Sequence, residues 1–138
     1  MLFIFVVMKK IIILFLELIL LVSCDPARFY DYYITNNCNE VINVKIEACS
    51  LNCGTQYAHK YEILNIQIES NTTQLILSDT YFQPLDNRMV EYFFKNIIIT
   101  KENVTSKINY VNKDLWVFKK VAKFHAESYL TVKSEDFE

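Results

Sequence analysis

The feature that most constrains the fold is a strict alternation of apolar and polar side chains in the run Ile42–Ala48. Successive side chains of a β-strand point to opposite faces of a sheet, so this run predicts a strand with one buried and one solvated face. Similar alternation recurs along the chain, and almost no stretch has the 3.6-residue period of a helix. The pattern therefore indicates an all-β fold.

The predicted strands follow one another at short intervals: 30–35, 42–48, 61–69, 73–78, 90–100, 106–111 and 126–133. The first two are expected to form a hairpin through the Asn-rich turn 36–39, because Asn tolerates positive φ where Gly is lacking. Leu75 and Leu77 are expected to face the core. About seven strands with this spacing predict a single antiparallel β-sandwich, immunoglobulin-like or closed into a small barrel.

Two segments are harder to assign. The run 90–100 is apolar almost throughout, which is typical of a central strand covered on both faces. In 112–122, Asn112 could cap a helical turn that includes Leu115 and Phe118, or 115–119 could form an edge strand. The helical or irregular alternative is preferred.

Composition excludes several classes of protein. Gly54 is the only glycine, whereas phosphate-binding loops, dinucleotide fingerprints and nucleophile elbows need several. Without the N-terminal Lys9, Lys10 and Glu17, 12 basic and 15 acidic side chains remain, a net charge of −3. Such a balance gives no electrostatic basis for binding nucleic acid. With 14% aromatic residues and two prolines, the chain can bury a core.

The N-terminal segment has the layout of an export signal. Lys9 and Lys10 precede an apolar run, 11–22, which is shorter than the roughly 20 residues of a spanning helix. The apolar residues 1–7 lie before the lysines, where a signal normally carries charge, so Met8 is a candidate for the true start. The alternative is an uncleaved anchor made of two apolar halves, against which the two adjacent lysines argue.

The segment ends in Leu21-Val22-Ser23-Cys24, which resembles the lipobox of bacterial prolipoproteins. The resemblance covers residues 8–24 and implies cleavage before Cys24, with a diacylglyceryl group on its sulfur. The implied organisation is a signal peptide (1–23), a lipidated Cys24 with a tether (24–28) and a β-sandwich (29–138). The mature part resembles small envelope lipoproteins, held by acyl chains such as palmitate at the cell membrane or the outer membrane. Ordinary secretion with an unmodified Cys24 is the alternative.

Three further cysteines remain. An extended strand over 40–48 would hold Cys38 and Cys49 roughly 30 Å apart, beyond the reach of a disulfide. The predicted pair is therefore Cys49–Cys53, which leaves Cys38 as a free, reactive thiol. A metal site of Cys49, Cys53 and His59 fits none of the usual zinc spacings, so no metal or cofactor is predicted.

Catalytic machinery has little support. His59 and His125 are the only histidines, and neither lies in a recognisable motif. Among the residues of the sequence, Cys53 with His59 is the best candidate for a nucleophile–base pair. The carboxylates of Glu135 and Asp136 are expected to be solvated. The protein is therefore predicted not to be an enzyme, with an unrecognised site that uses His59 or His125 as the alternative.

Aromatic residues are the stronger candidates for binding. Tyr81, Phe82 and Trp116 could line a surface for a protein or glycan, although burial in the core is the commoner fate of such side chains. The sequence thus predicts a lipid-anchored, non-enzymatic binding or assembly module. A secreted, unanchored protein with disulfides and glycans on the sequons of Asn71 and Asn103 is the alternative.

Overall fold

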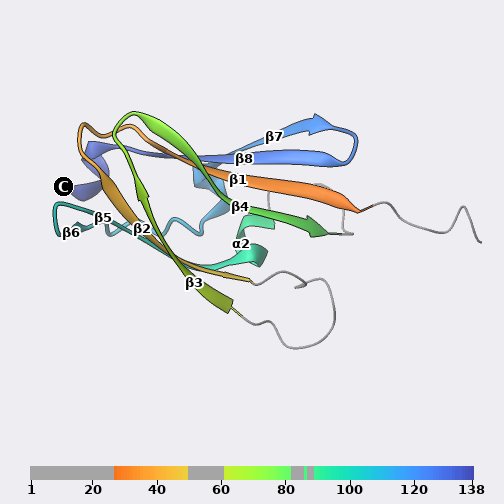
Figure 1. Ribbon diagram of the computed structural model, residues 1–138, viewed down its shortest axis with the longest axis horizontal. Helices are drawn as coiled ribbons and strands as arrows, with labels where there is room; N and C mark the ends of the chain where they lie inside the picture. The colour runs from red at the N-terminus through yellow and green to blue at the C-terminus, as the bar shows by residue number, and fades with distance from the viewer. Residues whose placement is uncertain (1–26, 50–60, 82–85, 87–88) are drawn as a thin grey trace, which may run out of the picture.

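The computed structural model describes residues 27–49, 61–81, 86 and 89–138, which form two four-stranded β-sheets (Figure 1). Sheet I has the strand order β4-β1-β8-β7, and sheet II has the order β3-β2-β5-β6. The strands of sheet I are β4 (Thr72–Tyr81), β1 (Arg28–Asn36), β8 (His125–Val132) and β7 (Trp116–Ala122). Those of sheet II are β3 (Tyr61–Ile68), β2 (Ile42–Cys49), β5 (Phe94–Lys101) and β6 (Val104–Thr105). The predicted all-β sandwich is confirmed, with two separate sheets rather than a closed barrel.

The alternation of side chains positions the core. Val44 and Ile46 of β2 are buried, whereas the alternating residues Asn43 and Lys45 are exposed, as predicted. On β1 the same parity buries Tyr32, whose ring makes edge contacts with those of Phe93, Phe94 and Trp116. Burial of one such apolar side chain contributes roughly 1.5–3 kcal/mol. The inner faces of both sheets thus build one core.

The predicted hairpin of the first two strands is wrong, because β1 and β2 belong to different sheets. The chain crosses between the sheets just after Asn36, which is fully buried. Its side-chain nitrogen donates to the carbonyl oxygens of Glu40 (2.8 Å), Ile68 (3.0 Å) and Glu69 (3.2 Å), and its oxygen accepts from the amide of Cys38 (2.9 Å). Asn36 therefore fastens this connection to the end of β3, and it does so without a positive φ.

Strands β1 and β8 lie side by side in the middle of sheet I and run parallel, with Asp31 opposite Glu127. The other strand pairs of the described residues are antiparallel. A parallel pair needs a long connection, and here residues 37–124 lie between the two strands. The first and last strands of the sandwich are thus direct neighbours within sheet I.

A bulge in β4 overturns part of the predicted core. Tyr32 pairs with Leu77 and Tyr33 with Leu75, so Ile76 is an extra residue of β4. It is buried, whereas Leu75 is 46% exposed. An extra residue shifts the alternation, so the expectation that Leu75 faces the core is wrong. Asp79 lies beyond the bulge on the same inner side as Leu77, and burial raises the pKa of its carboxyl group.

Three other predicted segments need correction. The apolar run 90–100 is split into α2 (Met89–Phe93), which lies between the two layers, and β5, one face of which is partly exposed (Figure 1). Segment 106–111 forms no strand. After a 3₁₀ turn, η1 (Lys113–Leu115), the chain continues as the edge strand β7, the alternative not preferred. Asn112 does cap η1, accepting from the amide of Asp114 at 3.1 Å.

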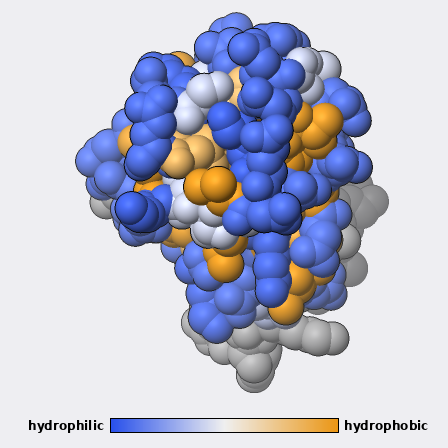
Figure 2. Space-filling view, turned by 90° about the vertical axis from the view of Figure 1, so that its left-hand side faces the viewer, coloured by the Kyte–Doolittle hydropathy of each residue, from blue (hydrophilic) through white to orange (hydrophobic). Residues whose placement is uncertain are grey.

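The two ends of the sandwich differ in what they carry. The chain enters β1 at one end, near the β7–β8 turn, because the amide of Phe29 donates to the carbonyl oxygen of Phe124 at 2.7 Å. The opposite end carries the 3₁₀ turn η2 (Ser134–Phe137) and the C-terminus (Figure 1). That end is largely hydrophilic, with hydrophobic residues in small separate groups (Figure 2). Among the described residues no helix is long and apolar enough to cross a membrane. The predicted signal segment 1–23 and Cys24 lie outside them.

Candidate functional site

The outer face of sheet I carries two neighbouring rows of side chains that cross all four strands. Cross-strand pairing aligns the first, here called the charged row, which consists of Ser78, Asp31, Glu127 and Lys119. The second, here called the aromatic row, consists of Leu75, Tyr33, Tyr129 and Val117. Rows of this kind form because residues of one parity on paired strands share a face.

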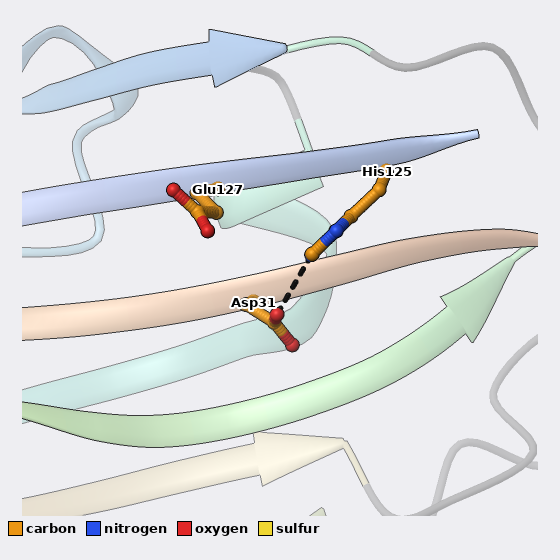
Figure 3. Close-up of side chains that lie close together, drawn as sticks. All are labelled: Asp31, His125 and Glu127. Carbon is orange, nitrogen blue, oxygen red and sulfur yellow. Dashed lines mark hydrogen bonds and ion pairs between the residues drawn. The ribbon is translucent and has the colours of Figure 1, made fainter. Parts of the chain in front are cut away.

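His125 lies beside the charged row, two residues before Glu127 on β8 and on the same face of the sheet. Its Nε2 lies 2.7 Å from Oδ2 of Asp31, across the junction of β8 and β1 (Figure 3). One ligand atom each of Asp31, His125 and Glu127 lie within 4.8 Å of one another. All three residues are half-buried. Two carboxylates and an imidazole thus gather on one side of the sheet.

Two hydroxyl groups hold the carboxylates in place. The hydroxyl of Ser78 donates to Oδ1 of Asp31 at 2.6 Å, and that of Tyr129 donates to Oε2 of Glu127 at 2.7 Å. The second bond, together with burial, raises the pKa of Tyr129 to about 12. Each carboxylate therefore has one oxygen engaged by a hydroxyl, and the other oxygen of Asp31 contacts His125.

The aromatic row offers a flat, amphipathic surface. The rings of Tyr33 and Tyr129 stack with their centroids 4.9 Å apart and their planes 11° from parallel. Leu75 and Val117 flank them and are 46% and 68% exposed. Burial, reinforced by the nearby carboxylates, raises the pKa of Tyr33. Aromatic rings with polar edges beside charged groups are typical of surfaces that bind protein or organic ligands.

The cluster contains the residue types of a hydrolase triad in the wrong order. A nucleophilic serine must donate to the histidine, which the aspartate then orients. Here Ser78 donates to Asp31, and Asp31 lies between it and His125. His125 also lines neither the surface hollow bounded by Asn43 and Asn65 nor the one beside Tyr110. This arrangement is suited to binding rather than to nucleophilic attack.

The predicted aromatic surface is not assembled. Trp116 is 5% exposed, stacks on Phe94 at 5.7 Å and donates its indole N–H to the carbonyl oxygen of Tyr110 at 2.8 Å. Its assignment to a surface is therefore wrong. Tyr81 is partly buried against the rings of Tyr92 and Phe93, and Phe82 lies outside the described residues.

The cysteine predictions have mixed outcomes. Cys38 is free, and the extended β2 separates it from Cys49, as expected. It is fully buried, however, and burial raises the pKa of its thiol, so the expectation of a reactive Cys38 is wrong. Cys53 and His59 lie outside the described residues, and the predicted Cys49–Cys53 disulfide stays a prediction.

The tail and the sequons have structural roles. Asp136 accepts from the amide of Lys133 at 2.9 Å and lies 3.4 Å from the hydroxyl of Tyr110, so it is not simply solvated. Asn71 and Asn103 are exposed and have φ of 53° and 70°. In a chain so poor in glycine, these turns explain the two asparagines without a glycan.

Sequence inspection singled out His125 but missed Asp31 and Glu127. Glu127 lies two residues after His125 on β8, so the alternation of side chains places both on the same face of the sheet. Asp31 is 94 residues away from His125, and only the pairing of β1 with β8 brings it there.

Comparison with models of known protein families, with curated proteins and with solved structures finds no match to this chain.

Proposed function

We propose that the protein is a lipid-anchored bacterial cell-envelope protein that acts as a non-enzymatic binding module. The observation that carries this proposal is the lipobox-like Leu21-Val22-Ser23-Cys24, which lies immediately before a folded β-sandwich. Strand β1 begins at Arg28, so three residues separate it from Cys24. At about 3.3–3.6 Å per residue, the sandwich would lie within roughly 15 Å of the acylated sulfur.

The residues at the β1 end of the sandwich suit a position in which this end faces the membrane. Lys120 and Lys123 on β7 and the β7–β8 turn are exposed there, next to the start of β1. Basic side chains beside an acyl anchor strengthen attachment to anionic lipid. The two acyl chains of a diacylglyceryl group give stable attachment by themselves, and the lysines would add to it and orient the sandwich.

The ligand surface that we propose is the outer face of sheet I, with its charged row and its aromatic row. Stacked tyrosines provide rigid contact area with little loss of conformational entropy, and the carboxylates accept hydrogen bonds. This combination suits a protein segment or a glycan. Nucleic acid fits it poorly, because two carboxylates would face the phosphates.

The anchor is tested by intact mass spectrometry of the full-length gene product expressed in bacteria, with Cys24→Ser as the variant. The expected species begins at residue 24 and carries acyl mass, and the Cys24→Ser protein should remain an unprocessed precursor or become soluble. Normal processing of the variant with complete retention in detergent extracts would refute the lipid anchor. Hexose mass on Asn71 and Asn103 of the protein from its natural source would favour the secreted, glycosylated alternative.

A further inference from the structure

We propose that Asp31, His125 and Glu127 form a binding site for one divalent transition-metal ion of the zinc type. The inference rests on the outer face of sheet I alone and does not depend on the lipid anchor. Figure 3 shows the side chains gathered on one side of the β1–β8 junction, with the imidazole of His125 turned toward Asp31.

The distances suit a small ion. The three ligand atoms lie within 4.8 Å of one another, and the shortest separation is the 2.7 Å between His125 Nε2 and Asp31 Oδ2. With zinc–ligand bonds of about 2.0–2.1 Å, tetrahedral ligand atoms lie about 3.3 Å apart. The Asp31–His125 pair must therefore open by about half an ångström while Glu127 moves closer, which are adjustments of side-chain torsions. Any proton on Nε2 passes to solvent as the ion binds.

The charges favour a cation at this position. Asp31 and Glu127 are direct cross-strand partners, and like charges placed opposite each other destabilise a sheet. The nearest lysine along the row, Lys119, is exposed, and no ion pair joins it to Glu127 in the part of the chain that the structure describes. A divalent ion would neutralise both carboxylates at once.

The hydroxyl partners give the site the support that metal ligands normally have. Ser78 and Tyr129 each donate to one oxygen of a carboxylate and leave the second oxygen for the ion. Such outer hydrogen bonds orient ligands, and their loss typically weakens metal binding by about 10–100-fold. The two donors come from β4 and β8, so the support is built into the sheet.

The donor set indicates which ion fits. One imidazole nitrogen with two carboxylates matches zinc and related first-row ions. Calcium prefers six to eight oxygen ligands, and magnesium keeps an all-oxygen octahedron. Three protein ligands leave a coordination position for water, or for an oxygen atom of a ligand that docks on the neighbouring aromatic row.

Cobalt(II) is the probe that tests the site, because its absorption separates nitrogen and oxygen ligands from thiolates. The full chain, purified in detergent and treated with a chelator, should bind one equivalent with weak visible bands and without an intense thiolate charge-transfer band. Zinc should displace the cobalt. The absence of saturable binding, or a thiolate band that disappears in Cys53→Ser, would refute the proposed site.

Four variants localise the binding. Asp31→Asn and His125→Gln should each weaken binding at least about 10-fold, and Tyr129→Phe about 10–100-fold. The matched control is His59→Gln, which removes the other histidine and should leave the affinity unchanged. The near-ultraviolet circular dichroism of each variant without metal checks its fold, and Asp31→Asn, which preserves side-chain shape, decides the result if His125→Gln unfolds. Unchanged affinity in a folded Asp31→Asn protein would overturn the proposal.

Discussion

The two faces of strand β1 show two different uses of one polypeptide segment. Its inner face presents Tyr32 and Asn36, which are enclosed by the other sheet and by the crossing connections. Its outer face presents Asp31 and Tyr33, whose partners are side chains of the neighbouring strands β4 and β8. The inner residues pack in the core and fasten the crossing between the sheets, whereas the outer ones are expected to contribute little to stability. The residues of the proposed binding sites on this strand therefore lie on its outer face.

The largest expected effect tests whether the inner polar residue is structural. Asn36→Ala should lower the free energy of unfolding by roughly 3–5 kcal/mol, because several buried backbone groups lose their partner at about 1–3 kcal/mol each. Urea denaturation measures the loss. Asn43→Ala, at an exposed position of β2, is the matched control and should cost no more than about 0.5 kcal/mol. Equal effects of the two substitutions would show that Asn36 does not hold the connection.

A smaller effect tests the inner and outer parity of β2. Val44→Ala should cost about 2–3 kcal/mol, since it removes buried methyl groups and leaves a cavity. Lys45→Ala, one residue along on the exposed side, should change stability by no more than about 0.5 kcal/mol. Thermal unfolding of the two variants makes the comparison. Comparable losses would mean that both faces of β2 are covered.

The smallest effect is expected on the outer face of sheet I. In the absence of metal, His125→Gln should cost at most about 1 kcal/mol, because its contact with Asp31 is partly exposed, at 34% and 18% for the two side chains. Urea denaturation with a chelator present measures it. A loss above about 2 kcal/mol would assign the cluster to the fold itself and would remove the contrast between the two faces of β1.

Much of the fold could be predicted because alternation is local. Val44 and Ile46 are assigned to the core by the period-two alternation of 42–48 alone, and their burial confirms it. The same rule failed at Leu75, because the bulge at Ile76 depends on pairing with β1 and leaves no local signal. It also failed in 90–100, where an apolar run fits a helical turn between the sheets as well as a strand.

The candidate site was predicted far less well than the fold. The sequence names His125 as one of the two histidines that an unrecognised site could use, but no motif points to its partner Asp31. Trp116 was proposed for a surface because sequence does not distinguish a buried tryptophan from an exposed one. Its place in the core depends on Tyr32 and Phe94, which come from two different sheets.

The sequence by itself determined which side of each regular strand is buried, because successive side chains of a strand alternate whatever the strand pairs with. The tertiary structure alone decided which strands are neighbours. The first two strands do not pair, and the first and last lie side by side in parallel. Pairing depends on how connections such as that held by Asn36 cross between the sheets. For that reason only the folded chain brings Asp31 to His125 and Glu127.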